Sequence, residues 1–209
     1  MYSPLSAEIS LKRYTYEEKY TPEFFELMIP KNLPRLKESF IELMKKISAS
    51  KKTSETWGML HYDYGDGNYS IDYVSGKITV YDFDNCCYGP FMYDIASMWR
   101  NGVGWRQFEK DAEKRRAFMD AYFAEVIRGY RSETELSDGQ LSLLPLYLEA
   151  VQMENIMDEF ELAHSAGEEP HIDKSLAYMI KCAQDGIPFQ GYFSDVYSPE
   201  APFEYEGEL

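Results

Sequence analysis

The chain has 209 residues, which suits one domain or two small ones, and its 44% hydrophobic and 16% aromatic residues are ample for a packed core. Its net charge of -15 argues against nucleic acid or an anionic membrane as a partner and leaves room for a cationic one, although plain solubility is the commoner reason for an acidic surface. The sequence predicts neither a signal peptide at Met1 nor a membrane span, and it is typical of a soluble, cytoplasmic protein.

The first predicted elements are short. The N-terminal segment is irregular and polar, apart from Thr15 and Glu18, whose spacing predicts a capping box. Thr21 followed by Pro22 is typical of a helix N-cap with proline at the first helical position. A short helix is therefore predicted over Glu23–Met28.

The next predicted element is a longer amphipathic helix over Asn32–Ile47. Its apolar residues recur at helical spacing and mark one buried face. These residues are Leu36, Phe40, Leu43, Met44 and Ile47. Ser48–Thr56 is a polar, lysine-containing linker, and Trp57–Leu60 leads an apolar stretch into the next segment.

Residues 61–84 read HYDYGDGNYSIDYVSGKITVYDFD and carry a short acidic motif at each end. The pattern H-x-D-x-x-x-x-N begins at His61, and D-F-D begins at Asp82. Two alternating apolar runs around Ser75 predict a β-hairpin, which would bring the second motif back beside the first. Several carboxylates and one amide would then converge on a small volume that suits Mg²⁺, a cation that prefers oxygen ligands.

The residue types in this segment suit phosphoryl transfer. That reaction needs a group to orient an acceptor hydroxyl and take its proton, and metal ions to neutralise charge on the phosphates. Asp63 suits the first role. Asn68 can offer a carbonyl oxygen and Asp82 a carboxylate to a metal, with Asp84 as a further ligand or as a group behind the ligands. His61 is better placed to hold the loop by hydrogen bonds than to take part in the chemistry.

This segment resembles the catalytic segment of the aminoglycoside phosphotransferase and choline kinase family, which shares the protein-kinase fold. The continuation YGPFMYDIA at residues 88–96 is similar to the family's segment that ends in Asp-hydrophobic-Ala. Residues 123–130 and 141–148 resemble its distal helices. The resemblance covers roughly residues 30–165. A chance match of the first motif alone is expected on the order of once in a hundred chains of this length, and the second motif at hairpin distance makes chance a poor explanation.

The resemblance implies an ATP-dependent kinase that transfers the γ-phosphate to a hydroxyl of a small molecule. It implies Asp63 as the catalytic base, Asn68 and Asp82 as Mg²⁺ ligands, and Asp94 as a brace for the catalytic loop. One departure is that tyrosines flank the base, at positions 62 and 64, where the family usually has glycine and leucine. This departure can change acceptor access.

After the second motif the chain passes through Cys86–Pro90 and is predicted to enter a helix near Tyr93, which would end around Gly102 and Gly104. The three cysteines are Cys86, Cys87 and Cys182. They have no metal-ligand spacing, so we expect reduced thiols in a cytoplasmic protein.

Three further helices are predicted. The first runs from about Gln107 to Gly129, with Gly129 as its stop, the second from Pro145 to about Leu162, and the last around residues 172–183. The apolar positions at helical spacing are Phe118, Ala121, Tyr122 and Val126 in the first; Leu148, Val151, Met153, Ile156, Met157 and Phe160 in the second; and Ile172, Leu176, Met179, Ile180 and Ala183 in the last. The methionines and aromatics on these stripes are predicted to be core rather than a ligand cage.

Acidic residues crowd the second of these helices. They are Glu149, Glu154, Asp158, Glu159 and Glu161. The ordinary interpretation is a solvated helix surface. In the family, however, the helices after the metal motif form the acceptor pocket, and a cationic acceptor such as an aminoglycoside or choline would favour carboxylates or aromatic faces there.

A kinase of this family also needs a β-rich lobe with a phosphate-covering loop and a strand lysine. Only about sixty residues precede His61, they are mostly helical in pattern, and G-x-G-x-x-G does not occur. The predicted fold class is therefore α+β and mainly helical: the C-terminal lobe of a protein-kinase-like phosphotransferase, with a small β-hairpin that carries the metal motif. We expect residues 1–193 to form this lobe, 194–209 to be a flexible acidic tail, and the N-terminal nucleotide lobe to be absent, so no nucleotide-binding residues are assigned.

Three functions remain open at this point. The first is the catalytic lobe of an ATP- and Mg²⁺-dependent small-molecule kinase, completed by an N-terminal lobe in trans or associated with further copies of itself. The second is a binding module that keeps the fold without transfer. The third is a metal-dependent phosphohydrolase, for which a single hairpin is a sparse metal cluster.

Overall fold

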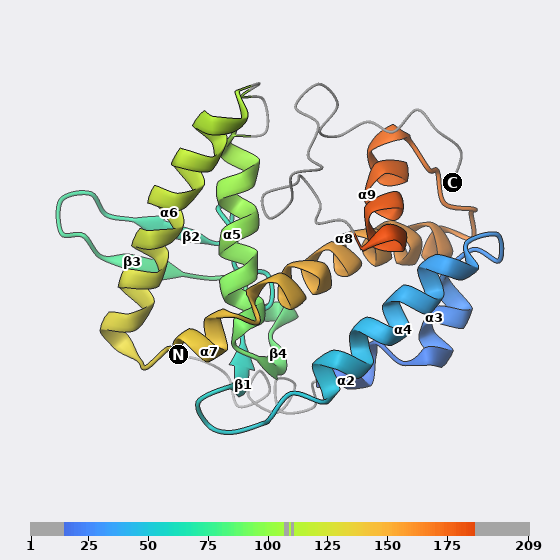
Figure 1. Ribbon diagram of the computed structural model, residues 1–209, viewed down its shortest axis with the longest axis horizontal. Helices are drawn as coiled ribbons and strands as arrows, with labels where there is room; N and C mark the ends of the chain where they lie inside the picture. The colour runs from blue at the N-terminus through green and yellow to red at the C-terminus, as the bar shows by residue number, and fades with distance from the viewer. Residues whose placement is uncertain (1–14, 107–108, 110, 187–209) are drawn as a thin grey trace.

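The computed structural model describes residues 15–106, 109 and 111–186. The predicted tail at 194–209 lies outside this part of the chain. The elements in chain order are α2 (Tyr16–Lys19), α3 (Pro22–Met28), α4 (Pro34–Ser48), β1 (Trp57–Leu60), β2 (Tyr69–Ile71), β3 (Ile78–Val80), the 3-10 turn η1 (Phe83–Asn85), β4 (Cys87–Pro90), α5 (Met92–Arg106), α6 (Ala112–Glu133), α7 (Asp138–Leu141), α8 (Leu144–Ala166) and α9 (Lys174–Asp185). The fold is mainly helical with two small antiparallel sheets, as predicted (Figure 1).

The first two helices begin as the sequence predicts. The Thr15 hydroxyl accepts a hydrogen bond from the backbone N–H of Glu18, and the Glu18 carboxylate accepts one from the Thr15 N–H, which completes the capping box. Thr21 caps α3 by accepting from the N–H of Phe24, and proline stands at the start of that helix. Both caps satisfy backbone donors that have no partner within their own helix.

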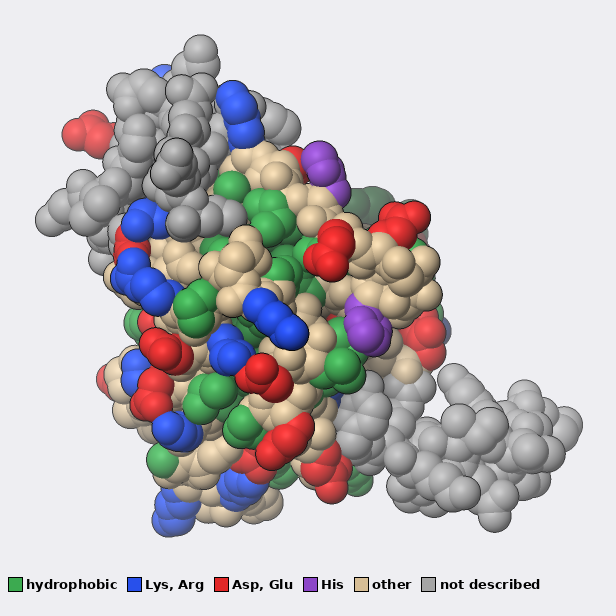
Figure 2. All heavy atoms as spheres, turned by 90° about the vertical axis from the view of Figure 1, so that its right-hand side faces the viewer, with side chains coloured by type: hydrophobic (Ala, Val, Ile, Leu, Met, Phe, Trp, Pro, Cys, Tyr) green, Lys and Arg blue, Asp and Glu red, His purple; other side chains and the backbone are tan. Residues whose placement is uncertain are grey.

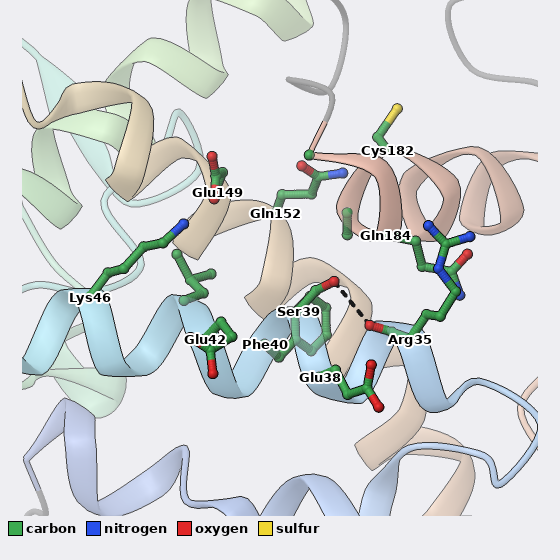
Figure 3. Close-up of a pocket in the computed structure, with 13 residues that line it drawn as sticks. Arg35, Glu38, Ser39, Phe40, Glu42, Lys46, Glu149, Gln152, Cys182 and Gln184 are labelled. Atoms are coloured by element: carbon green, nitrogen blue, oxygen red, sulfur yellow. Dashed lines mark hydrogen bonds between the residues drawn. The ribbon is translucent and has the colours of Figure 1, made fainter.

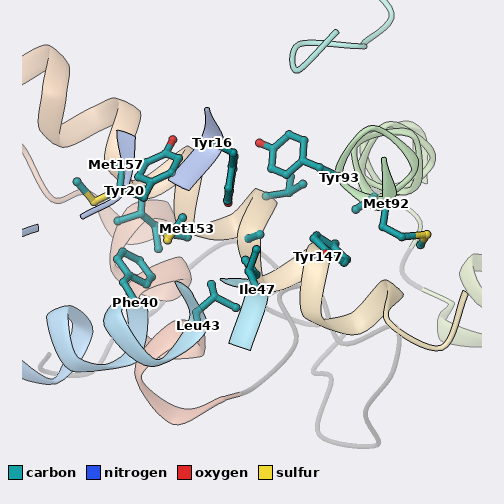
Figure 4. Close-up of a cluster of buried hydrophobic side chains, with 14 of the residues drawn as sticks. Tyr16, Tyr20, Phe40, Leu43, Ile47, Met92, Tyr93, Tyr147, Met153 and Met157 are labelled. Atoms are coloured by element: carbon teal, nitrogen blue, oxygen red, sulfur yellow. The ribbon is translucent and has the colours of Figure 1, made fainter. Parts of the chain in front are cut away.

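Helix α4 buries all five residues of its predicted apolar stripe, each with at most 7% of its surface exposed. The helix begins at Pro34, two residues after the predicted start, because the proline occupies the first turn. Its stripe packs into a core shared with α2, α5 and α8 (Figure 4). Burial of side chains of this size stabilises the fold by about 1.5–3 kcal/mol each.

Strands β1 and β4 form an antiparallel pair that the sequence did not predict. Trp57 lies opposite Pro90, and Leu60 lies opposite Cys87. The pair fixes the chain immediately before the catalytic loop against the chain immediately before α5. It therefore positions the first motif relative to the helix that supports it.

Strands β2 and β3 form the predicted hairpin, with Tyr69 opposite Val80 and Ile71 opposite Ile78. The turn includes Gly76 at φ 71°, a conformation that glycine adopts without strain. The Asp72 carboxylate accepts hydrogen bonds from the backbone N–H and the hydroxyl groups of the turn. The hairpin projects away from the helices (Figure 1).

One predicted helix end agrees with the structure and one is wrong. Helix α5 ends at Arg106, two residues after Gly104, whereas α6 continues through Gly129 to Glu133. None of these glycines has a positive φ, whereas Gly167 and Gly186 do and end α8 and α9. At Gly102 the reason for glycine is packing, because a Cβ there would lie 2.5 Å from the ring of Tyr122 on α6. Helix α6 begins at Ala112 with Asp111 as its N-cap; the predicted start at position 107 lies outside the described residues.

The long helix α8 lies at the centre of the molecule and contacts α3, α4, α5 and α9 (Figure 1). On the face that carries α3, α4 and α9, acidic and basic side chains are interspersed with apolar ones (Figure 2). Among the described helices, none is long and apolar enough to cross a membrane. All three cysteines are buried, and none of them forms a disulfide bond.

Candidate active site

The loop that carries the first motif, residues 61–68, begins directly after β1 and is held by a carboxylate from α5; the family resemblance implies that it is the catalytic loop. Asp94 accepts a hydrogen bond from the backbone N–H of His61 at 2.9 Å and another from the N–H of Tyr62 at 3.0 Å. Burial raises the pKa of Asp94, and the two N–H donors act in the opposite direction. The first turn of α5 therefore fixes the backbone one residue before Asp63.

The side chain of His61 links the two ends of the hairpin. Its Nε2 lies 2.9 Å from the carbonyl oxygen of Tyr81, and its ring packs on Phe83 with 4.6 Å between ring centroids. The residue is only 7% exposed. His61 therefore connects the start of the first motif to Tyr81, the residue directly before the D-F-D motif.

Asn68 and Asp63 are joined within the loop. The Asn68 Nδ2 group donates to the carbonyl oxygen of Asp63 at 2.7 Å and to its Oδ2 at 3.0 Å. The backbone carbonyl of Asn68 accepts from the N–H of Tyr81 at 3.0 Å. The Asp63 side chain is exposed, so one carboxylate oxygen is held by the amide while the group stays accessible to a substrate.

The carboxylates of the D-F-D motif lie against each other. A hydrogen bond with Asp84, and then the charge of Asp84, raise the pKa of Asp82; the charge of Asp63 adds to the effect. Asp82 has φ 65°, an uncommon backbone conformation for a residue other than glycine. The hairpin thus brings Asp82 and Asp84 near Asp63, whose carboxylate is held by Asn68.

This donor set fits a hard divalent cation. Two neighbouring carboxylates that repel each other are relieved by a positive charge, and an amide oxygen is an ordinary ligand for Mg²⁺ or Ca²⁺. In the described part of the chain, no group of three or more His, Cys, Asp or Glu side chains is clustered tightly enough to bind a metal by itself. A cation here would therefore share its shell with phosphate oxygens and water.

Helix α5 also holds the far half of the loop, through residues that the sequence analysis did not identify. Asp66 accepts from the hydroxyl of Tyr69 at 3.1 Å and from the indole N–H of Trp105. Asn101 donates to the carbonyl oxygen of Tyr64. No local pattern marks the contacts of Asn101 and Trp105, because each joins residues more than thirty positions apart.

Beside the loop, helix α8 contributes an acidic group that is not a solvated surface residue. Burial and the nearby Asp158 raise the pKa of Glu154 to about 8, while hydrogen bonding to Tyr62 and the charge of Lys19 lower it. Arg100 on α5 donates to Asn155 and lies near the charges of Asp63 and Asp158. The interpretation of this helix face as solvated is wrong at Glu154, because α8 is central to the fold.

A small cavity of about 190 Å³ opens beside the loop, between α2 and the chain after β3. Its lining residues are Tyr16, Lys19, Tyr62, Asp84, Asn85, Cys86 and Cys87. A larger groove, of about 360 Å³, lies between α4, α8 and α9 (Figure 3). The described residues that line this groove include Arg35, Lys46, Glu149 and Gln152, and none of them belongs to the catalytic loop, so it is not part of the candidate site.

Comparison with known proteins identifies relatives of this chain. Residues 4–136 match the phosphotransferase enzyme family. Amicoumacin kinase of Bacillus subtilis (strain 168) is 28% identical over 120 residues, which are 57% of this chain and 34% of that protein. A solved structure of amicoumacin kinase hAmiN in complex with AMP-PNP, Ca²⁺ and Ami is similar, with a TM-score of 0.67 and 28% identity.

The structural match covers 85% of this chain and 52% of the solved one, so the chain spans about half the length of that relative and about a third of the curated one. The family match includes the catalytic loop, the hairpin, the D-F-D motif and α5. It covers well over half of the 209 residues. The chain belongs to the phosphotransferase enzyme family and has its kinase-like fold.

Proposed function

We propose that this chain supplies the catalytic and acceptor-binding lobe of an ATP-dependent kinase that phosphorylates a hydroxyl group of a small molecule in the cytoplasm. The observation that carries the proposal is the convergence of Asp63, Asn68, Asp82 and Asp84 at one end of the β2–β3 hairpin, in a member of a phosphotransferase family. The AMP-PNP and Ca²⁺ in the solved relative support a nucleotide and a divalent cation as further participants.

In this proposal Asp63 is the catalytic base. Its Oδ2 is held by the Asn68 amide, which leaves Oδ1 to accept a hydrogen bond, and then the proton, from the acceptor hydroxyl. The backbone before it is fixed by Asp94, so the carboxylate is oriented before the acceptor arrives. Exposure of Asp63 is consistent with contact with a substrate.

Asn68 and Asp82 would hold Mg²⁺, with Asp84 behind Asp82. The Nδ2 group of Asn68 is occupied by Asp63, so its Oδ1 is the atom left to face a cation. When bound, the metal supplies neutralisation of negative charge on the phosphates. Asp84 raises the pKa of Asp82 through a hydrogen bond and through its charge, and a bound cation would stabilise the ionised form of both carboxyl groups.

The acceptor side favours a small molecule that carries positive charge as well as a hydroxyl group. Asp158 lies on the helix that faces Asp63, and Tyr16, Tyr62 and Asp84 are among the residues that line the adjacent cavity. The net charge of -15 also attracts a cationic acceptor, over a longer range. Amicoumacin is the first compound to test, because two relatives are amicoumacin kinases.

A nucleotide lobe, in cis or in trans, would complete the site. The β2–β3 hairpin and the turn after it expose several large apolar side chains, as a surface that packs against another lobe or a second copy would. These are Ile71, Tyr73, Val74, Ile78, Tyr81 and Phe83. We therefore expect the 209 residues alone to bind nucleotide very weakly, to associate, and to transfer no detectable phosphate.

The acceptor half of the proposal is tested by calorimetric titration of the chain with amicoumacin, aminoglycosides, choline, homoserine and neutral sugar alcohols at two salt concentrations. A cationic acceptor should bind, and its affinity should fall as salt rises, because exposed charges are screened over about 8–10 Å. If a neutral compound binds best and salt does not change its affinity, the proposal that the acceptor is cationic is wrong.

The alternative is a binding module that keeps the acceptor site and performs no transfer. The lack of a G-x-G-x-x-G motif in the sequence is the observation that favours it. The two functions separate when radiolabelled Mg·ATP, the bound acceptor and a separately produced nucleotide lobe of a relative are mixed with the chain. Transfer that needs both proteins supports the kinase, and acceptor binding without transfer in any combination supports the module.

A further inference from the structure

Tyr62, the residue directly before the proposed catalytic base, has a backbone conformation that side chains rarely adopt. Its φ is 72°, in the left-handed region, where the Cβ of any residue other than glycine crowds the backbone. A conformation of this kind persists only where the surrounding structure holds it. The contacts of Tyr62 therefore decide the direction in which the chain continues to Asp63.

Two consecutive residues of α5 hold the backbone and the ring of Tyr62. The carboxylate of Asp94 accepts a hydrogen bond from the Tyr62 backbone N–H at 3.0 Å. The fully buried ring of Tyr93 stacks on the Tyr62 ring, with centroids 4.8 Å apart and ring planes 12° apart. The angle φ relates the direction of the N–H group to the direction of the side chain. Because both groups are held on one helix, φ at Tyr62 is fixed as well.

The far end of the Tyr62 side chain is held from another part of the fold. Its hydroxyl lies 2.9 Å from the hydroxyl of Tyr20, the residue that follows α2. Tyr20 is itself fixed, because it is only 2% exposed and its ring stacks on Phe25 of α3. The ring of Tyr16 on α2 packs edge-on against the Tyr62 ring, with 6.0 Å between centroids. Tyr16, Tyr20 and Tyr93 belong to one buried cluster (Figure 4), so the Tyr62 ring cannot turn while these contacts persist.

We propose that Tyr20, Tyr62 and Tyr93 are positioning residues of the proposed phosphotransferase: Tyr20 and Tyr93 clamp the Tyr62 side chain, and this clamp holds the left-handed backbone that orients Asp63. The inference rests on the proposed function for what Asp63 does, whereas the clamp is a property of the folded chain. A tyrosine that only filled the core would stabilise the whole fold, whereas a positioning tyrosine acts on the loop more than on the rest of the molecule.

The test measures amide hydrogen exchange of the purified chain by NMR, without nucleotide, metal or acceptor. Protection of the His61 and Tyr62 amides reports the hydrogen bonds to Asp94 that hold the loop. Protection of amides in the middle of α8 reports the stability of the whole fold, so the ratio of the two isolates the loop. The chemical shifts of the Asp63 and Asn68 amides report the direction of the chain after Tyr62.

Three variants at Tyr62 separate backbone strain from packing. Tyr62→Ala removes the ring and keeps the Cβ that opposes a positive φ, Tyr62→Gly removes both, and Tyr62→Phe removes only the hydroxyl. Tyr20→Phe removes the same contact between hydroxyls from outside the loop. Tyr93→Phe is the matched control, because its ring stays in place and its hydroxyl has no hydrogen-bond partner among the described residues.

Tyr62→Ala should lower the protection of the His61 and Tyr62 amides roughly tenfold more than that of the α8 amides, the scale that backbone strain of this kind implies. Tyr62→Gly should recover part of this loss and return the loop shifts toward those of the unmodified chain, because glycine adopts the conformation freely. Tyr62→Phe and Tyr20→Phe should each give a smaller loss. The double variant should lose no more than Tyr62→Phe alone, because the two hydroxyls form one contact. Tyr93→Phe should leave the protection and the shifts unchanged.

An equal fall in protection at the loop and at α8 in Tyr62→Ala would overturn the inference. So would protection of the His61 and Tyr62 amides that is the same in Tyr62→Ala as in the unmodified chain. If Tyr62→Ala does not fold, Tyr62→Phe and Tyr20→Phe decide the question, and an unchanged loop in both would overturn the clamp. None of these measurements depends on phosphate transfer. A chain that transfers no phosphate can still show the clamp, and an active kinase can lack it, so failure of this inference and failure of the proposed function are separate outcomes.

Discussion

Asp63 is the residue on which the proposed chemistry depends most. Asp63→Asn keeps the size of the side chain and removes the group that would take the acceptor's proton. In an assembly of the chain with a nucleotide lobe, turnover should fall by roughly a hundredfold or more, the usual scale for a positioned base, while Mg·ATP affinity changes little. Steady-state kinetics measure both quantities. Asp120→Asn, at an exposed carboxylate on α6, is the control. Near-normal turnover in Asp63→Asn would show that Asp63 is not the catalytic base.

The two aspartates of the D-F-D motif should differ in their effects. Asp82→Asn removes a proposed metal ligand, so it should weaken Mg·ATP binding as well as turnover. Asp84→Asn should do less, because we place Asp84 behind the ligand, where its main effect is on the charge of Asp82. Calorimetric titration of both variants with Mg·ATP compares them directly. Equal losses would mean that this ranking is wrong.

Glu154 should make the stability of the fold depend on pH. Its pKa in the folded chain is about 8, above the usual value near 4.5, so the folded state binds the proton over a range in which the unfolded state has released it. Stability contributed by this group is therefore complete below about pH 4.5 and is lost as pH rises to about 8, by up to about 1.4 kcal/mol per pH unit.

Urea denaturation of the unmodified chain and Glu154→Gln, at pH 5.5 and 7.5, measures this contribution. The unmodified chain should lose more stability over this interval than the variant. Parallel losses would show that Glu154 has no raised pKa in the folded protein. The comparison between the two proteins removes the effects of the other titrating groups.

At the scale of elements, the packing of α5 on α6 depends on one glycine. Gly102→Ala would place a Cβ 2.5 Å from the Tyr122 ring, and the hydroxyl of that tyrosine is bonded to the carbonyl of Met98 at 2.9 Å. Overpacking of this kind costs about 1–3 kcal/mol. Gly104→Ala, two positions further along the same helix, has no atom within 4 Å and should stabilise the chain by about 0.5–1 kcal/mol.

Chemical denaturation of the two alanine variants should show that Gly102→Ala lowers the free energy of unfolding and that Gly104→Ala raises it. Gly102→Ala should also disturb the catalytic loop, because Asn101 and Trp105 on either side of it hold Tyr64 and Asp66. Equal stability of the two variants would contradict the close approach of α5 and α6.

The elements that sequence could predict are those with a local cause. The stripe of α4 and the caps at Thr15 and Thr21 depend on residues within one or two turns. The β1–β4 pair could not be predicted, because each strand has only four residues and the two lie nearly thirty positions apart. Gly129 does not end α6, because it lacks the positive φ of a C-terminal glycine cap, and sequence alone does not show that conformation.

The residues of the candidate site also fall into those that the sequence could place and those that it could not. Asp63, Asn68, Asp82 and Asp84 follow a motif with fixed spacing, so their placement together could be predicted. Glu154 and Lys19 could not be associated with the loop from sequence, since α2 and α8 meet it only through the fold. The burial that raises the pKa of Glu154 is likewise a property of the packed molecule.

At the scale of the whole molecule, the central claim is that this chain is one lobe of a phosphotransferase. Its helices support the loop after β1, and the β2–β3 hairpin exposes apolar residues that a second lobe or a further copy would cover. The claim therefore concerns two parts acting together, and it predicts different behaviour for the chain alone and for the chain with a nucleotide lobe.

The most direct measurement is transfer of radiolabelled γ-phosphate from Mg·ATP to amicoumacin or to another acceptor that the chain binds. The chain alone should transfer nothing detectable. The chain with a nucleotide lobe should transfer phosphate, and Asp63→Asn should abolish that transfer. Efficient transfer by the monomeric chain alone, or undiminished transfer by Asp63→Asn in the complete assembly, would contradict the proposal.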